Sequence, residues 1–188
     1  MDKVVDALEG RAGTILDLAS GPGEPAATIA EALPSAHVLA TDVADAMVAA
    51  ATNATSHLSN VKVQLADAQN LEGMSDASYD VVTCCYGYMF PTEKETALAE
   101  TLRVLKPGGT LLLMEHVAAP EGTPLRYLQK TLAPILEIVG NGCQWRDTEK
   151  ILRASWDFED LRVEPFSADA MPLPFRPHIL ATATKRQR

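Results

Sequence analysis

Two glycines follow a short apolar run that is expected to form a β-strand. Gly21 and Gly23 lie just after residues 14–18 and just before a helical pattern that runs to about residue 33. Glycine has no Cβ, so the backbone of such a loop can approach a ligand closely. The helix that follows offers free N–H groups to the same ligand. The spacing therefore predicts a loop that binds a nucleotide-like molecule.

Two aspartates follow the next two expected strands. Asp42 comes after residues 37–41, about 20 residues beyond the glycine loop, where an acid accepts both hydroxyls of a ribose. Asp67 comes after the apolar run 61–66 and is placed to accept a hydrogen bond from the exocyclic amine of adenine. Either residue alone could instead be a helix N-cap. Together with the glycine loop they predict an adenosine site.

Asp17 separates two kinds of nucleotide. It stands inside the first strand, four positions before Gly21, where dinucleotide enzymes usually have an apolar residue. A carboxylate there suits a ligand with an ammonium and a sulfonium group better than a pyrophosphate, because like charges repel. Gly21-x-Gly23-x-x-Ala26 also matches a relaxed dinucleotide fingerprint, so a nicotinamide-dependent oxidoreductase stays an alternative, which Asp17 and Asp67 disfavour.

The elements that must position these residues alternate between short apolar runs and helical patterns, which predicts βαβ units and a largely parallel sheet. The expected strands are 14–18, 37–41, 61–66, 79–85, 110–117, 160–166 and 178–183. Further helices are expected over 44–57, 92–105, 125–139 and 148–155. Pro134 should kink or break the helix over 125–139. Residues 106–109, Lys-Pro-Gly-Gly, predict a turn before the fifth strand.

Composition limits the classes of partner. The chain has 188 residues, enough for a single domain over 1–188, and a net charge of −9, which disfavours nucleic acid and anionic membrane surfaces. No apolar run reaches the ~20 residues of a membrane span, and no signal peptide is recognisable. Three cysteines do not suggest a disulfide framework, so a cytoplasmic protein is expected. No metal is expected, because the adjacent Cys84 and Cys85 point to opposite faces of a strand.

The motifs together resemble those of class I S-adenosylmethionine-dependent methyltransferases over residues 14–117, especially Leu-Lys-Pro-Gly-Gly at 105–109. This half is similar to the ubiquinone/menaquinone C-methyltransferases. The C-terminal part resembles the methyltransferase-like alkyl-thiol S-methyltransferases at Glu115-His116-Val117, Gly142-Cys143 and Arg176-Pro177-His178-Ile179. The resemblance implies a Rossmann-like, doubly wound α/β sheet of about seven strands, mostly parallel with an antiparallel last strand.

The resemblance also implies S-adenosylmethionine as cofactor and assigns residues to it. Gly21 and Gly23 would pass under its methionine portion, and Asp17 would help to place the amino group. Asp42 would hold the ribose, and Asp67 the adenine. The implied cofactor-binding residues are Asp17, Ala19, Gly21, Gly23, Asp42, Val43, Met47, Asp67, Ala68, Cys84 and Cys85.

Methyl transfer mainly requires alignment of donor and acceptor and exclusion of water. His116, near the end of the fifth strand, is the candidate general base if the acceptor is a thiol or hydroxyl. Tyr86 is the second catalytic candidate, and Tyr88, Cys143 and His178 are the substrate-binding candidates. Each of these residues could instead serve only in packing or in structural hydrogen bonds.

The expected activity is methyl transfer to a small-molecule acceptor, with a thiol or another soft nucleophile on an apolar metabolite preferred. Only residues 1–13 precede the first strand, so the pocket is expected to be open, covered by residues 118–146, or closed by a second subunit in a homodimer. A catalytically weak accessory subunit that keeps the cofactor site is the alternative from a different class.

Overall fold

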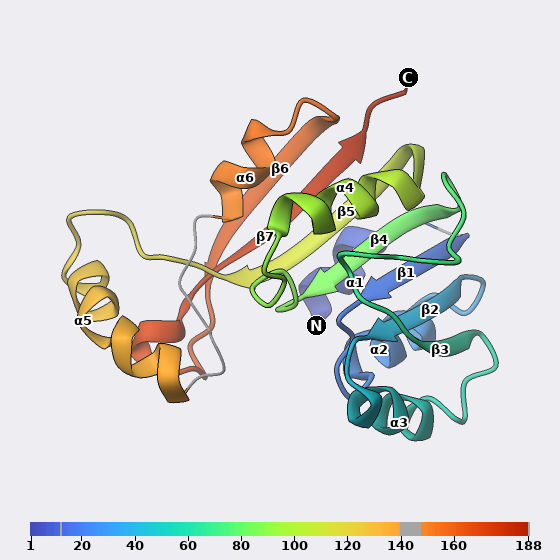
Figure 1. Ribbon diagram of the computed structural model, residues 1–188, viewed down its shortest axis with the longest axis horizontal. Helices are drawn as coiled ribbons and strands as arrows, with labels where there is room; N and C mark the ends of the chain where they lie inside the picture. Colours follow the sequence, from blue (N-terminus) through green and yellow to red (C-terminus); the bar gives the residue numbers. More distant parts are fainter. Residues whose placement is uncertain (12, 140–147, 188) are drawn as a thin grey trace.

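The computed structural model describes residues 1–11, 13–139 and 148–187. Seven strands form one sheet in the order β3-β2-β1-β4-β5-β7-β6 (Figure 1). Their bounds are Thr14–Leu18 for β1, His37–Asp42 for β2, Val61–Leu65 for β3, Tyr79–Cys85 for β4, Leu105–His116 for β5, Phe158–Ser167 for β6 and Pro177–Lys185 for β7. Strands β1 to β5 pair in parallel, whereas β7 is antiparallel to both β5 and β6. The expected fold class is confirmed.

Helices cover both faces of this sheet. Their bounds are Asp2–Leu8 for α1, Glu24–Ala32 for α2, Asp45–Ala54 for α3, Lys94–Val104 for α4, Pro124–Val139 for α5 and Thr148–Ala154 for α6, and a 3-10 helix, η1, spans Leu173–Phe175. Helices α1 and α2 share one apolar core with the sheet, and α4 and α6 share the other. Because both faces are covered, the central strands β1 and β4 consist mostly of apolar residues instead of alternating with polar ones.

Strand β1 pairs with β2 on one side and with β4 on the other, so the strand order reverses between β1 and β4. In open α/β sheets, ligands bind outside the carboxyl ends of the strands at this point of reversal. The glycine loop begins at the carboxyl end of β1, so the fold places it at the expected binding edge.

The Lys-Pro-Gly-Gly segment differs from its expected place. Strand β5 already begins at Leu105, which pairs with Tyr79, and regular pairing resumes at Thr110 opposite Val81. The residues between them therefore form a bulge inside the strand instead of a turn before it. Gly108 allows this because its φ is +76°, a conformation that residues with a Cβ rarely adopt.

Helix α5 stands apart from the sheet at one end of the molecule (Figure 1). The helix is not broken at Pro134, since α5 continues beyond it to Val139. Pro134 and Lys130, whose carbonyl loses its helical partner, are both exposed, so water can satisfy that carbonyl. Among the described residues, no helix is long and apolar enough to cross a membrane.

Candidate functional site

The glycine loop is joined to the end of β2 by hydrogen bonds. The N–H of Gly21 donates to Oδ2 of Asp42 at 2.9 Å, and the N–H of Ala44 donates to Oδ1 of the same carboxylate at 3.0 Å. Each carboxylate oxygen has a second lone-pair site, so Asp42 keeps the capacity to accept two hydroxyls of a ligand. The structure thus brings together two residues that the sequence had assigned to one ligand.

The two glycines of the loop have different surroundings. A Cβ added to Gly21, whose φ is +57°, would meet no atom within 4 Å, so this backbone faces open space. A Cβ added to Gly23 would lie 2.9 Å from the Cα of Ala51 in α3. Gly21 is therefore the position at which a ligand can approach the backbone, and Gly23 lets α2 and α3 pack.

Asp17 lies beneath the loop and is fully enclosed. Its Oδ1 accepts the hydroxyl of Thr83 at 2.6 Å, whereas Oδ2 has no partner among the described residues. Burial raises the pKa of Asp17 to about 6, although the hydrogen bond from Thr83 opposes this shift. An enclosed carboxyl with one oxygen unpaired is an acceptor that the protein itself does not satisfy.

The carboxylate after β3 is also tied into the binding edge. Asp67 is half-buried and accepts the N–H of Gln69 at 2.9 Å. The side-chain oxygen of Gln69 accepts in turn the N–H of Glu93 at 2.8 Å and the hydroxyl of Thr92 at 3.1 Å, just before α4. Gln69 thus fixes the distance between the Asp67 loop and the start of α4.

Exposed apolar side chains lie next to these carboxylates. Val43, directly after Asp42, is 67% exposed, and Met47 in α3 is 37% exposed, while Ala68 is half-buried. Both apolar side chains would lose contact with water under a flat aromatic ligand, and burying apolar area in this way is favourable. The positions predicted for adenine and ribose contacts therefore share one edge.

Cys84 and Cys85 lie at the end of β4 with their side chains in opposite cores, as strand geometry requires. Both thiols are free and buried, and burial raises the pKa of each. They are therefore poor nucleophiles, and a ligand could meet them only through their backbone. The described residues contain no cluster of three metal-ligating side chains.

A row of rings crosses the C-terminal side of the sheet. His116 of β5 is the cross-strand partner of His178 of β7, which in turn pairs with Phe166 of β6. The ring centroids are 6.3 Å apart for the histidines and 5.2 Å apart for His178 and Phe166. Tyr86 meets His178 edge-on at 5.5 Å, and Phe175 of η1 lies 6.0 Å from His116. We call these five residues the ring cluster.

Burial sets the protonation of this cluster. It lowers the pKa of His116, assisted by His178, so that the His116 imidazole is neutral near pH 7. Nδ1 of His178 lies 2.8 Å from the carbonyl of Arg176, which only accepts, so Nδ1 donates to it, and the buried Nε2 has no hydrogen-bond partner among the described residues. Burial raises the pKa of Tyr86 to about 12, and its phenol stays protonated.

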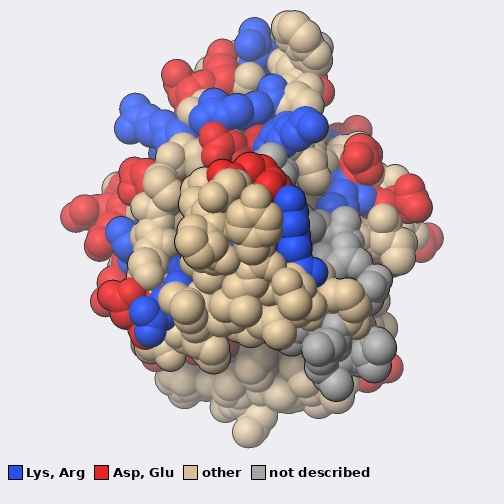
Figure 2. Space-filling model, turned by 90° about the vertical axis from the view of Figure 1, so that its left-hand side faces the viewer, with Lys and Arg blue, Asp and Glu red and all other residues tan. Residues whose placement is uncertain are grey.

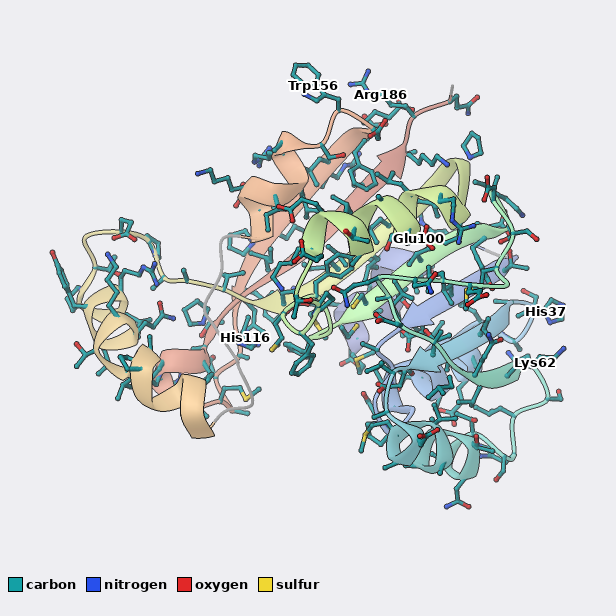
Figure 3. The ribbon with its side chains drawn as sticks, viewed as in Figure 1. His37, Lys62, Glu100, His116, Trp156 and Arg186 are labelled. Atoms are coloured by element: carbon teal, nitrogen blue, oxygen red, sulfur yellow. The ribbon has the colours of Figure 1, made fainter. Side chains whose placement is uncertain are left out.

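A pocket of about 520 Å³ borders the cluster through Phe166 and His178, and its other walls include Val117, Leu125 and Leu173. In Figure 3, His116 lies where β5 meets the segment that leads to α5. Figure 2 shows the face that α5 turns outward, where acidic and basic side chains lie above and to the left of a broad area with few charges. An apolar wall with polar ring nitrogens beside it suits an apolar molecule with one protic group.

The predicted substrate residue Tyr88 does not join this cluster. The Tyr88 hydroxyl lies 2.6 Å from Oγ1 of Thr101, and the side chain is buried beneath α4. Tyr88 therefore packs under α4, which is the structural role that the sequence had left open as an alternative. Cys143 lies outside the described residues.

Sequence reasoning missed several residues that shape the site. A Cβ on Gly87 would meet the Sγ of Cys84 at 2.5 Å and the Cβ of Ala19 at 2.6 Å, so the loop after β4 packs directly on the glycine loop. A glycine between two tyrosines, at 86–88, could have indicated this close contact from the sequence. Glu115, a carboxylate in the apolar run of β5, was another. No local pattern marks Phe166 or Phe175.

Comparison with known proteins identifies the class. A family described as "Methyltransferase domain" matches residues 15–109, which is half of the chain. The demethylmenaquinone methyltransferase of Thermus thermophilus is 32% identical over 169 residues, covering 89% of this chain and 71% of its own. The chain therefore belongs to the class I S-adenosylmethionine-dependent methyltransferase family, and S-adenosylmethionine is the cofactor of this family.

Other similarities extend this result. The thiol S-methyltransferase TMT1B of Rattus norvegicus is 33% identical over 134 residues, covering 69% of this chain and 53% of its own. The chain thus spans about half the length of the thiol S-methyltransferases that it matches. The YcgJ protein of Bacillus subtilis has 19% identity and a TM-score of 0.76, over 100% of this chain and 98% of its own. The [4+2]-cyclase SpnF has 23% identity and a TM-score of 0.78, over 100% and 81%. These two structures share the fold.

The residues at the binding edge fit S-adenosylmethionine. Gly21 presents open backbone, Asp42 keeps acceptor capacity for a ribose, and Val43 and Met47 offer apolar surface. The unpaired oxygen of Asp17 is oriented by Thr83 beneath the same loop. The two carboxylates complement a cofactor with two positive groups and no phosphate.

Proposed function

We propose that this protein transfers a methyl group from S-adenosylmethionine to a small apolar acceptor, with a thiol preferred. The observation that carries the proposal is that the ring cluster lies near the carboxyl ends of the strands that form the cofactor edge. Tyr86 directly follows β4, which pairs with β1, whose end opens into the glycine loop. The cofactor edge and the ring cluster are thus joined through two neighbouring strands.

When bound, S-adenosylmethionine would supply an electrophilic methyl group on its sulfonium sulfur. The lone pair of the acceptor forms the new bond to the methyl carbon, and the electrons of the old carbon–sulfur bond stay on the sulfur. The chain has three tasks in this reaction. It must hold the acceptor in line, exclude water and take up the proton that a neutral thiol loses. Alignment supplies ~7–11 kcal/mol of the barrier reduction, and a general base about 10²–10⁴-fold in rate.

We assign the proton to His116, whose lowered pKa keeps it neutral and able to accept at pH 7. Tyr86 cannot be the base at that pH, because its pKa is raised to about 12. Its phenol instead donates a hydrogen bond that orients the acceptor. Nε2 of His178, which has no partner among the described residues, is left to meet the protic group of an acceptor in the pocket that His178 lines.

The similarity to a thiol S-methyltransferase supports a thiol, and that to a demethylmenaquinone methyltransferase supports a quinol carbon. We favour the thiol because a thiol loses its proton to an imidazole more readily than a phenol does. The test is incubation with methyl-labelled S-adenosylmethionine and matched aliphatic thiols, phenols and carboxylates, followed by mass spectrometry. Methylated thiol supports the proposal, and transfer confined to phenols or carboxylates refutes the thiol.

The accessory-subunit alternative has its own outcome in this experiment. Binding of S-adenosylhomocysteine without transfer to any acceptor would favour it, and sedimentation would then show whether the chain forms a homodimer. The oxidoreductase alternative is set aside, because the chain belongs to the methyltransferase family. We also propose the cytoplasm as its compartment, since Cys84 and Cys85 are free thiols.

A further inference from the structure

The loop after β4 is held at one residue from two sides. The N–H of Tyr88 donates to Oε1 of Glu115 at 2.8 Å, and the carbonyl of Tyr88 accepts from Nζ of Lys94 at 2.7 Å. The Lys94 ammonium also donates to the carbonyls of Met89 and Pro91, both at 3.0 Å. Glu115 and Lys94 thus bind backbone rather than solvent, and we call them the Tyr88 clamp.

Both clamp residues are buried, which is unusual for ionisable side chains. Glu115 is 2% exposed and Lys94 6% exposed. Burial of a charge is costly unless hydrogen bonds and an opposite charge compensate it. Burial raises the pKa of Glu115 to about 8, while the N–H groups of Tyr88 and Gly87 and the charge of Lys94 oppose the shift. An apolar side chain at either position would avoid the cost of burying a polar group, so the clamp is not explained by stability alone.

The clamp lies next to the residues that link the two halves of the site. Tyr86, two positions before Tyr88, has a φ of +61°, a strained conformation for a residue with a Cβ. Gly87 packs on Ala19 of the glycine loop so closely that a Cβ would not fit. A shift of the Tyr88 backbone would therefore move both the Tyr86 ring and the contact with the glycine loop.

We propose that Glu115 and Lys94 are positioning residues, which hold the backbone of Tyr88 so that Tyr86 faces His116 and His178 and Gly87 stays against Ala19. The roles of Tyr86 and His116 rest on the proposed function, whereas the hold on the loop does not. Positioning errors of about 1 Å cost on the order of 10²-fold in rate, so a small loop shift is sufficient for a large effect.

The test compares Glu115→Ala, Glu115→Gln and Lys94→Met with two exposed controls, Glu164→Ala on β6 and Lys62→Met on β3. Lys62 lies at the β3 edge of the sheet, away from His116 (Figure 3). Glutamine keeps a carbonyl oxygen for the N–H of Tyr88, so it should rescue what alanine loses. The measurements are kcat, KM for the acceptor, affinity for S-adenosylhomocysteine, and hydrogen exchange of the amides between residues 86 and 93.

We expect Glu115→Ala and Lys94→Met to lower kcat on the order of 10²-fold and to speed exchange in residues 86–93, with the controls unchanged and Glu115→Gln close to wild type. A loss of kcat in Glu115→Gln equal to that in Glu115→Ala would overturn the proposal, and so would unchanged exchange in all three variants. If the wild type methylates no acceptor, the proposed function fails, but the exchange data still decide whether the clamp holds the loop.

Discussion

His116 and His178 are direct cross-strand partners in the antiparallel pair of β5 and β7, and their ring centroids lie 6.3 Å apart. Directly opposed residues share one face of a sheet, so both imidazoles belong to the same ring cluster. Phe166 continues the row on β6. The register of the two outermost strand pairs therefore determines which side chains an acceptor molecule would meet.

Removal of the candidate base should reduce turnover without loss of cofactor binding. We expect His116→Gln to lower kcat about 10²–10⁴-fold with a thiol acceptor, because it removes the group to which we assign proton uptake. Affinity for S-adenosylhomocysteine, measured by calorimetry, should stay unchanged. The matched control is His37→Gln, an exposed histidine at the start of β2 and far from His116 (Figure 3). Full turnover in His116→Gln would show that the acceptor needs no base from this residue.

The pH dependence of turnover should report the same imidazole. Burial and His178 lower the pKa of His116 from 6.5, so the acid limb of kcat/KM should have an apparent pKa below 6.5. Above that value His116 is neutral and the rate should form a plateau. A profile measured between pH 4.5 and pH 9 checks this expectation, and an acid limb above pH 7 would contradict it.

Asp42→Ala should weaken cofactor binding. The substitution removes the acceptor for the ribose hydroxyls and the two hydrogen bonds from Gly21 and Ala44. We expect a loss of ~1–3 kcal/mol in the binding of S-adenosylhomocysteine, measured by calorimetry. The nearby exposed Asp45→Ala, in the first turn of α3, serves as the control. Equal affinity in wild type and Asp42→Ala would mean that the ribose lies elsewhere.

Stability should fall as the pH rises through the range of Glu115. Its pKa is about 8 in the folded protein against 4.5 for the ordinary side chain, so the folded state binds the proton more tightly than the unfolded chain. The free energy of unfolding should therefore decrease between pH 4.5 and about 8, with Asp17 adding to the decrease between pH 3.8 and about 6. Urea unfolding at several pH values measures this slope. In Glu115→Gln the slope above pH 6 should flatten, and an unaltered slope would assign it to other groups.

Gly87→Ala should destabilise the fold and disturb the cofactor site together. The added methyl would lie 2.5 Å from the Sγ of Cys84 and 2.6 Å from the Cβ of Ala19, so the glycine loop must move. Overpacking of this kind costs ~1–3 kcal/mol in the free energy of unfolding. Cys84→Ala in the same chain should restore part of it, as thermal unfolding would show. A neutral Gly87→Ala would mean that the two loops separate without cost.

The sequence by itself determined the features that depend on neighbours in the chain. Short runs of mostly apolar residues placed β1 and β4 at their observed bounds, because a strand that is covered on both faces buries most of its side chains. Gly21, Asp42 and Asp67 were recognisable because each follows a strand directly, and parallel strands bring their carboxyl ends to one edge. The order of the elements was therefore sufficient for the cofactor edge.

Only the tertiary structure decided which distant residues meet. The ring cluster depends on strand register, and a shift of one residue would turn its side chains to the other face. Glu115 and Tyr88 are 27 positions apart, and no local pattern pairs them. The Tyr88 side chain lies beneath α4, where its hydroxyl shares a hydrogen bond with Thr101. Contacts between distant parts of the chain depend on how the sheet is paired and covered, so local sequence patterns do not specify them.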